Sequence, residues 1–141
     1  MKAKRVTILF LGDIKFDSRS LKMINTLVNQ NYFIDIYSFH QFIVSPEILA
    51  ETAKKDPYLC NERINIQYVR LKQKNKVPFL DFYLKALIYT FKNRSDYYIC
   101  PDIYSLPLAF LASVFSKAQY IYDSRELYAG LASLQNKKLK Q

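Results

Sequence analysis

Short apolar runs alternate along this chain with segments in which apolar residues recur every three or four positions. The first run, RVTILFL at residues 5–11, is rich in β-branched residues and ends at Gly12, which is typical of a strand buried on both faces. The next segment has its apolar residues at helical spacing, at Leu21, Ile24, Leu27 and Val28. Because strand and helix alternate, we expect a parallel sheet with helices on both faces.

The same alternation continues as far as residue 122. We expect further strands at residues 33–39, 64–71, 96–100 and 119–122. We expect one helix to begin at Asp17 and Ser18, and others to occupy residues 45–55, 78–92 and 106–115. These elements predict an α/β chain, residues 1–141, that forms a single Rossmann-like domain of three α/β/α layers. Its parallel sheet should have about five strands in the order 3-2-1-4-5.

Composition excludes several classes of protein. The longest apolar runs are shorter than the ~20 residues needed to cross a bilayer, and the start of the chain lacks the pattern of a signal peptide, so we expect a cytoplasmic protein. Cys60 and Cys100 are too few for a disulfide framework or a four-thiolate zinc site. We expect both to be reduced, packed thiols.

The inventories of glycine and histidine limit the chemistry further. Only Gly12 and Gly130 occur, whereas a dinucleotide fingerprint or a phosphate-binding P-loop needs several glycines. His40 is the single histidine, and we expect it to be structural or merely exposed rather than catalytic. No carboxylate pair stands at helical spacing beside histidine or cysteine, so we expect neither a metal site nor a cofactor.

Net charge suggests anionic partners. The sequence carries 21 Lys and Arg against 12 Asp and Glu, a formal charge of +9, which favours nucleic acid, phosphorylated molecules or an anionic membrane, or serves only solubility. No nucleic-acid-reading motif is recognisable. Four cations crowd one window and suit docking at a membrane face: Arg70, Lys72, Lys74 and Lys76. The helix at residues 78–92 has more apolar surface than one sheet face hides, so it meets another domain, another subunit or a membrane, or lies beneath neighbouring elements.

Ligands of parallel α/β sheets bind beyond the carboxyl ends of the strands, which points to the loops after the first, third, fourth and fifth strands. In the first loop, Asp17, Arg19 and Lys22 surround the start of a helix, where an anion is favoured. Alternatively, Asp17 caps the helix and the two cations are solvated. After the last strand, Asp123 and Glu126 have the spacing of a capping box.

Two segments resemble a known family. RVTILFLGDIKFDSRSLKMINTLVNQNYFIDIYS is similar to the opening of family 4 type glycosyltransferases of the GT-B fold, with a glycine loop followed by Asp-x-Arg-x-x-Lys. DYYICPDIYSLPLAFLAS, followed by YIYDSRELY, is similar to the family's aspartate loop and its Tyr-Asp-Ser-His-Glu-Leu segment. The resemblance implies the amino-terminal, acceptor-side domain of an enzyme that moves a sugar from a nucleotide-sugar to a glycan or a lipid-linked acceptor. It also implies retention of the anomeric configuration and a role in polysaccharide biosynthesis.

The resemblance implies a set of acceptor-binding residues: Gly12, Asp13, Asp17, Arg19, Asp102, Asp123, Ser124, Arg125 and Glu126. Relatives often carry histidine at the positions of Ile99, Pro101 and Arg125, so no catalytic residue is assigned to this chain. Arg125 could instead bind a phosphate or carboxylate of the acceptor.

The nucleotide-sugar donor would be held mainly by a carboxyl-terminal domain, which 141 residues cannot also contain. We therefore expect the chain to be inactive alone and to dock, as a peripheral protein, at the inner membrane face. The alternative is a non-catalytic Rossmann-like interaction module or one half of a split two-chain enzyme.

Overall fold

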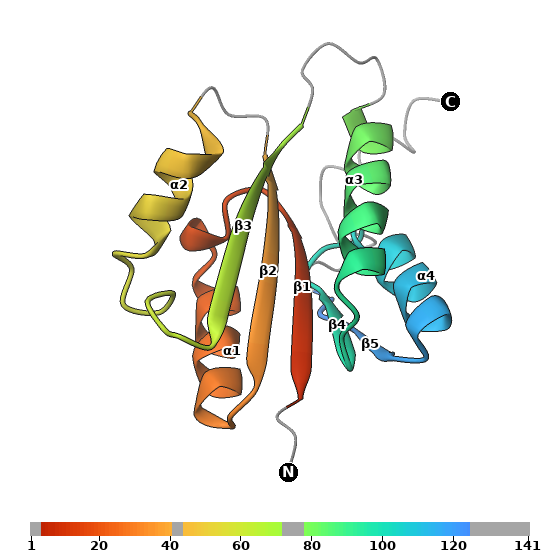
Figure 1. The fold of residues 1–141 in the computed structure, drawn as a ribbon, viewed down its shortest axis with the longest axis horizontal. Coiled ribbons are helices and arrows are strands. Elements are labelled where there is room, and N and C mark those ends of the chain that lie inside the picture. Colours follow the sequence, from red (N-terminus) through yellow and green to blue (C-terminus); the bar gives the residue numbers. More distant parts are fainter. Residues whose placement is uncertain (1–3, 41–43, 72–77, 125–141) are drawn as a thin grey trace, which may run out of the picture.

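The computed structural model describes residues 4–40, 44–71 and 78–124, which form a three-layer α/β/α fold (Figure 1). Its strands are β1 (Arg5–Leu11), β2 (Phe33–His40), β3 (Ile64–Arg70), β4 (Tyr97–Cys100) and β5 (Gln119–Tyr122). All neighbouring strands are parallel, and their order is β3-β2-β1-β4-β5. The predicted Rossmann-like fold and the strand order 3-2-1-4-5 are therefore confirmed.

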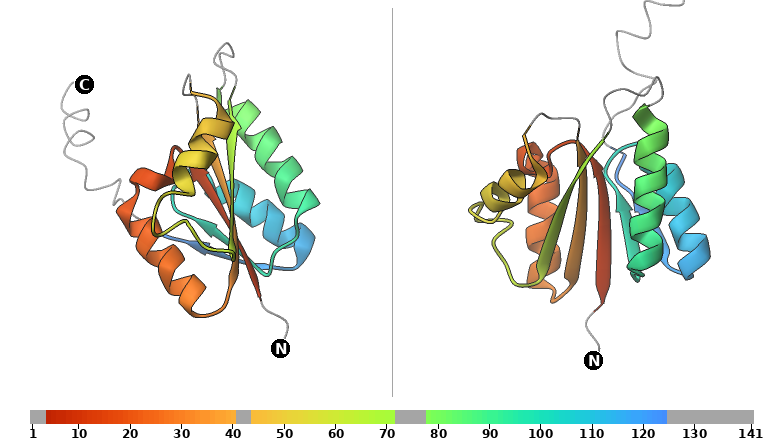
Figure 2. Two further views of the ribbon diagram at one scale, coloured as in Figure 1. Left: turned by 60° about the vertical axis from the view of Figure 1, so that its left-hand side comes forward. Right: turned by 45° about the horizontal axis from the view of Figure 1, so that its top comes forward.

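Helices cover the sheet on both faces. The helical elements are η1 (Ile14–Phe16), α1 (Ser18–Asn29), α2 (Pro46–Ala53), α3 (Pro78–Lys92) and α4 (Leu106–Ser116). Helices α1 and α2 lie on one face, and α3 and α4 lie on the other (Figures 1 and 2). This arrangement follows from right-handed crossovers that run outward from β1 in both directions.

The central strand supplies both cores because successive side chains of a strand point to opposite faces. Ile8 packs against the α1 and α2 side, in a cluster that includes Leu21 and Ile24 of α1. Leu9 packs on the other side, in a cluster that includes Phe82 of α3 and Leu108 of α4. An uninterrupted apolar run, rather than an alternating one, therefore marks this strand in the sequence.

The helix and strand limits agree with the predicted ones to within two residues, and those of β1, β5 and α3 coincide with them. The 3-10 element η1 was not predicted, and it arises because the Asp13 side chain accepts a hydrogen bond from the backbone N–H of Lys15 at 3.2 Å. The helix expected to open at Asp123 falls outside the described residues. Cys100 is buried as expected, whereas Cys60 is exposed, because it lies in the turn that follows α2 rather than in the core.

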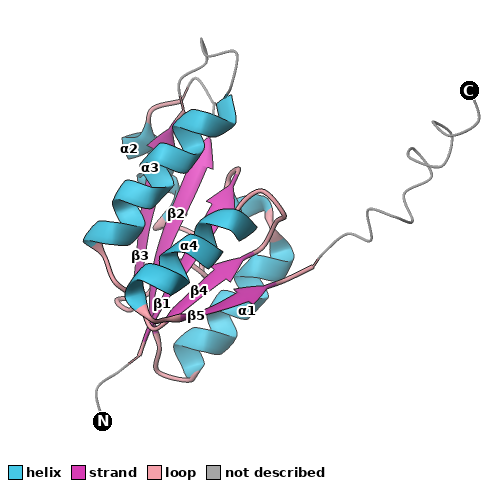
Figure 3. Cartoon of the chain, turned by 90° about the vertical axis from the view of Figure 1, so that its right-hand side faces the viewer, coloured by secondary structure: helices cyan, strands magenta, loops and turns pink. Residues whose placement is uncertain are grey.

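Helix α3 keeps an apolar stripe on its outer surface. Phe82 and Ala86 are buried against the sheet, and Figure 3 looks onto the face that α3 and α4 cover. The side chains that remain exposed recur along one side of the helix: Leu80, Leu84, Ile88 and Phe91. The expectation that one sheet face cannot hide this helix is confirmed for the described residues.

We predict that Phe82→Ala lowers the free energy of unfolding by about 3–5 kcal/mol, because truncating a fully buried aromatic ring leaves a cavity in the core. Leu84→Ala, on the exposed side of the same helix, should change it by less than about 1 kcal/mol. Urea denaturation of the two variants measures the difference. Equal losses would contradict the assignment of the two faces of α3.

Candidate functional site

The loops that follow β1, β4 and β5 meet at the carboxyl edge of the sheet. Gly12 begins the first loop with φ of 130°, a conformation that side-chain-bearing residues rarely adopt. Its N–H donates to the Phe39 carbonyl at 2.8 Å, and its own carbonyl accepts a hydrogen bond from the Ser38 hydroxyl. The glycine therefore turns the chain sharply while both of its backbone groups are held by β2.

Asp13 is buried beneath this loop. Its Oδ1 accepts hydrogen bonds from the Tyr68 hydroxyl at 2.9 Å and from the backbone N–H of Lys15 at 3.2 Å. Lys15 Nζ lies 3.8 Å from its Oδ2. Burial, followed by the hydrogen bond to Asp13, raises the pKa of Tyr68 well above its usual value of 10.0, so Tyr68 stays a donor. Asp13 thus holds the loop in place from below and does not face solvent.

His40 lies next to this pair, at the end of β2. Its side chain is 2% exposed, and its ring meets the Tyr68 ring edge-on with centroids 5.9 Å apart. Burial lowers the pKa of His40 below 6.5. The negative charge of Asp13 acts in the opposite direction, and the positive charge of Arg70 adds to the lowering. A neutral, buried imidazole agrees with the structural role expected from the sequence.

Asp17 caps helix α1. Its Oδ1 accepts from the backbone N–H groups of Arg19 and Ser20, both at 3.2 Å. This bears out the capping interpretation of Asp17. The Arg19 side chain turns instead toward the loop after β5, at the same edge of the sheet, where its Nη2 lies 2.7 Å from Asp123 Oδ1. The sequence placed both residues at this edge, but it did not show that they pair.

Asp102 connects the loop after β4 to the end of β1. Its carboxylate accepts from the backbone N–H of Ser105 at 2.8 Å and from that of Leu11 at 3.5 Å. Burial raises the pKa of Asp102, and these hydrogen bonds act in the opposite direction. Burial also raises the pKa of the neighbouring Cys100 thiol to about 12, so this thiol is not a nucleophile near neutral pH.

The expected acceptor-binding residues therefore separate into two groups. Gly12, Asp13, Asp17 and Asp102 shape and anchor the loops. Exposed polar groups at the same edge come from Arg19, which is paired with Asp123, and from Ser124. Arg125 and Glu126 lie outside the described residues.

The predicted membrane-docking window is described only at its first residue. Arg70 is exposed at the end of β3, and its backbone carbonyl accepts from Lys85 Nζ at 2.6 Å. Lys72, Lys74 and Lys76 lie outside the described residues. No described helix is both long and apolar enough to span a membrane. Within residues 4–40, 44–71 and 78–124, no three His, Cys, Asp or Glu side chains gather in a way that could bind a metal ion.

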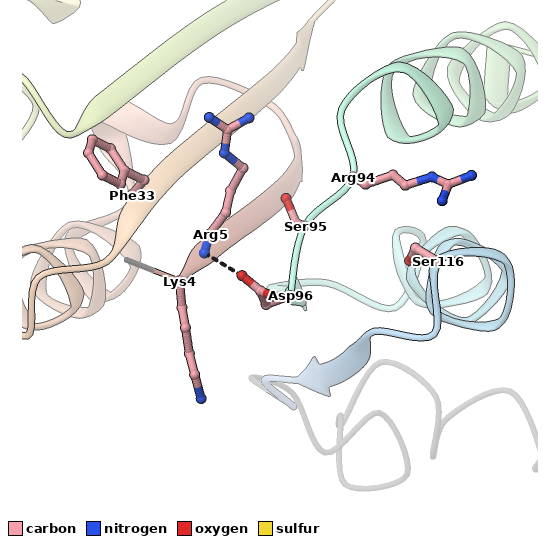
Figure 4. A pocket seen from close by; sticks show the side chains of 7 residues that line it. All are labelled: Lys4, Arg5, Phe33, Arg94, Ser95, Asp96 and Ser116. Atoms are coloured by element: carbon pink, nitrogen blue, oxygen red, sulfur yellow. Dashed lines mark hydrogen bonds between the residues drawn. The ribbon is translucent and has the colours of Figure 1, made fainter. Parts of the chain in front are cut away.

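A cavity lies at the opposite, amino edge of the sheet, which sequence reasoning missed. Its volume is about 670 Å³, and seven residues line it (Figure 4): Lys4, Arg5, Phe33, Arg94, Ser95, Asp96 and Ser116. These residues stand in four separate segments, most of them just before a strand or after a helix. No local sequence signal links them, because only the sheet brings the segments together.

Comparison with known proteins identifies a fold. No protein-family model matches the sequence, and no curated protein sequence matches it significantly. Among solved structures, the C-terminal domain of a hydrogenase from Pyrococcus furiosus superposes with a TM-score of 0.60 and 9% identity, over 85% of this chain and 91% of that one.

Two further solved structures are several times longer than this chain. The glycotransferase of kitacinnamycin superposes with a TM-score of 0.56 and 14% identity, over 86% of this chain and 30% of that one. TcCGT1 in complex with UDP superposes with a TM-score of 0.52 and 13% identity, over 86% and 28%. This chain thus shares a Rossmann-like α/β architecture with both proteins and spans less than a third of either one. Identities this low establish shared architecture and not a shared reaction.

We predict that the stability of the chain decreases as the pH falls below about 6.5, through the single histidine. The pKa of His40 is lower in the folded state than in the unfolded state, so the unfolded chain binds more protons in this range and stability rises with pH. Urea denaturation at several pH values measures this slope in the wild type and in His40→Gln. In His40→Gln, the free energy of unfolding should depend less on pH below about 6.5 than in the wild type. Parallel curves of stability against pH for the two proteins would contradict the role given to His40.

Proposed function

We propose that this chain is the acceptor-side half of a GT-B glycosyltransferase of the family 4 type. In this proposal the enzyme transfers a sugar from a nucleotide-sugar to a glycan or lipid-linked acceptor, and a separate donor domain binds the nucleotide. The observation that supports it best is that the two family-like segments meet at one edge of the sheet. Arg19 from the first segment and Asp123 from the second form an ion pair of 2.7 Å there.

The geometry suggests different roles for the polar residues of this edge. Asp13, Asp17 and Asp102 already accept hydrogen bonds from the chain itself, so we propose them as positioning residues. Arg19 is 61% exposed, and beyond the Nη2 that meets Asp123 its guanidinium has further donors for an anionic or hydroxyl-rich acceptor. Ser124 adds an exposed hydroxyl at the same edge. We propose that Arg125 and Glu126 complete this surface.

The transfer itself would need groups from outside this chain. The bond between the anomeric carbon and the nucleotide phosphate breaks, a bond from the acceptor oxygen to that carbon forms, and the proton of an acceptor hydroxyl passes to the departing phosphate. Departure of the nucleotide requires groups that stabilise its developing charge. In this proposal these groups belong to the donor domain, because His40 is buried and the residues at positions 99 and 101, Ile99 and Pro101, carry no imidazole.

A second candidate is a non-catalytic interaction module, or one half of an enzyme split over two chains. The positions of Ile99 and Pro101, where relatives often carry histidine, favour it. This candidate has the same acceptor surface as the first. A split enzyme should transfer sugar once a donor domain is supplied, and a non-catalytic module should not.

We also propose that the basic window beginning at Arg70 and continuing with Lys72, Lys74 and Lys76 attracts an anionic membrane. Basic residues near such a surface contribute about 1 kcal/mol each. Flotation of the chain with vesicles of phosphatidylglycerol, but not with vesicles of phosphatidylcholine, is the expected result. Equal behaviour with both kinds of vesicle would contradict this part of the proposal.

We predict that Arg19→Gln weakens binding of an anionic acceptor analogue without an apolar tail, such as a sugar phosphate, by about tenfold, because it removes one charge-assisted hydrogen bond. The free energy of unfolding should change by about 1 kcal/mol or less, since the Arg19 side of the ion pair is largely exposed. Isothermal titration calorimetry measures the affinity. Lys54→Gln is the matched control, because it removes an exposed cation at the end of α2.

Backbone amide NMR of the full chain tests where the acceptor binds. The acceptor analogue should shift the amides of Gly12, Arg19 and Ser124, and UDP should shift them far less. Arg125→Ala should weaken binding of the analogue as Arg19→Gln does. Unchanged affinity in both variants, or shifts confined to the amino edge of the sheet, would overturn the proposed acceptor surface.

We predict that residues 1–141 alone transfer no sugar from a nucleotide-sugar to an acceptor, because in this proposal the donor domain supplies the groups that bind the nucleotide. A radiolabelled donor assay measures this. Transfer by the chain alone would contradict the division into an acceptor half and a donor half. Transfer that appears only after a separately produced donor domain is added would favour the split enzyme over the non-catalytic module.

A further inference from the structure

The cavity at the amino edge of the sheet carries an excess of positive charge. Lys4, Arg5 and Arg94 line it against one carboxylate, Asp96. Asp96 is already engaged, because its Oδ2 accepts the backbone N–H of Arg5 at 2.8 Å (Figure 4). The guanidinium of Arg5 lies 3.4 Å from Asp35. Of the lining cations, Lys4 and Arg94 therefore carry charges that no described carboxylate pairs with, and their side chains extend in different directions (Figure 4).

The two cations differ in how they are held. Lys4 Nζ donates to the Tyr97 hydroxyl at 3.0 Å and lies over the Tyr97 ring, 5.3 Å from its centroid, which orients the ammonium without neutralising it. The exposed Arg94 guanidinium makes no hydrogen bond or ion pair with another described residue. An arginine in a cavity with free donors is suited to a phosphate or a carboxylate.

A second, smaller hollow adjoins the first. It has a volume of about 130 Å³ and lies between α3 and α4, where six residues line it: Thr90, Phe91, Arg94, Ala112, Phe115 and Ser116. The rings of Phe91 and Phe115 stand 5.1 Å apart between centroids, and both are more than half exposed. Arg94 and Ser116 line both hollows. A cationic cavity thus adjoins an apolar slot.

Helix ends explain part of this charge but not its arrangement. Both α3 and α4 end near this edge, and helix C-termini favour cations. Lys92 in the last turn of α3 and Lys117 at the cap of α4 stand where that effect acts. Arg94 lies beyond the end of α3, and Figure 4 shows its side chain extending toward the helices near Ser116.

We propose that the two hollows together bind an anionic amphiphile, a molecule with a phosphate or carboxylate head and a short apolar tail. Arg94 holds the head, and Ser116, whose hydroxyl donates to the Ala112 carbonyl, lies beside it. Lys4 extends in another direction (Figure 4) and adds only to the positive charge of the cavity. The tail lies in the slot against Phe91 and Phe115. This site does not depend on glycosyl transfer, because it is at the opposite edge of the sheet from the proposed acceptor surface and shares no residue with it.

Hexyl phosphate is a suitable probe, with inorganic phosphate and hexanol as its two halves. Calorimetry on the full chain should show that hexyl phosphate binds at least about tenfold more tightly than either half, since each buried methylene adds to the affinity of the head. Arg94→Gln should weaken binding of hexyl phosphate about tenfold. Phe115→Ser should weaken binding of hexyl phosphate and leave the affinity for inorganic phosphate unchanged.

Matched controls separate the site from general effects. Lys55→Gln removes an exposed cation on the α2 side, and Ile48→Ser removes an exposed apolar side chain there; both should bind hexyl phosphate as the wild type does. Arg94→Lys keeps the charge and should retain more affinity than Arg94→Gln. Equal losses in Arg94→Gln and Lys55→Gln would overturn the proposal and assign the attraction to net charge. Inorganic phosphate that binds as tightly as hexyl phosphate would overturn it as well.

Vesicles of equal parts phosphatidylglycerol and phosphatidylcholine identify the source of the ligand. Vesicle binding that Arg94→Gln and Phe115→Ser both weaken, together with binding of hexyl phosphate, supports the site and assigns it to a bilayer lipid. Binding of hexyl phosphate without vesicle binding supports it and assigns it to a free molecule. Vesicle binding without any binding of hexyl phosphate overturns it.

Discussion

Burial of the sheet on both faces is the constraint on which the rest of this structure depends. Strand β1 pairs with β2 on one side and β4 on the other, so its backbone groups are satisfied within the sheet and its side chains enter two separate cores. Ile8 belongs to one core and Leu9 to the other. Because all strands are parallel, the loops of both halves of the domain are brought to one edge, and the strand starts are brought to the opposite one.

At the carboxyl edge, buried polar contacts fix the loops on which exposed groups stand. The Asp13 carboxylate is held by Tyr68 from β3, and Asp102 holds the end of β1. Buried polar groups are costly unless they are hydrogen-bonded, so these contacts leave each loop few alternative positions. Arg19 is therefore presented at a defined place, where it meets Asp123.

The two faces and the two edges of the domain differ in what they offer to partners. On the α3 and α4 side, Leu84, Ile88 and Phe115 stay exposed, although aliphatic and aromatic side chains usually contribute most when they are buried. At the amino edge the same helices end beside a cationic cavity lined by Arg94. Apolar surface and positive charge are thus adjacent at the edge where a parallel sheet does not usually bind its ligands.

The sequence by itself determined the fold class, the strand order, the Asp17 cap and the apolar excess of the helix at residues 78–92, because local periodicity and capping chemistry depend on neighbours in the chain. It also located the loops of the carboxyl edge. Only the tertiary structure decided that Asp13 is buried under Tyr68, that Arg19 pairs with Asp123, and that Cys60 is exposed. The amino-edge cavity also could not be predicted from the sequence. Such contacts join residues distant along the chain, and their geometry exists only after the sheet has set the distances between strands.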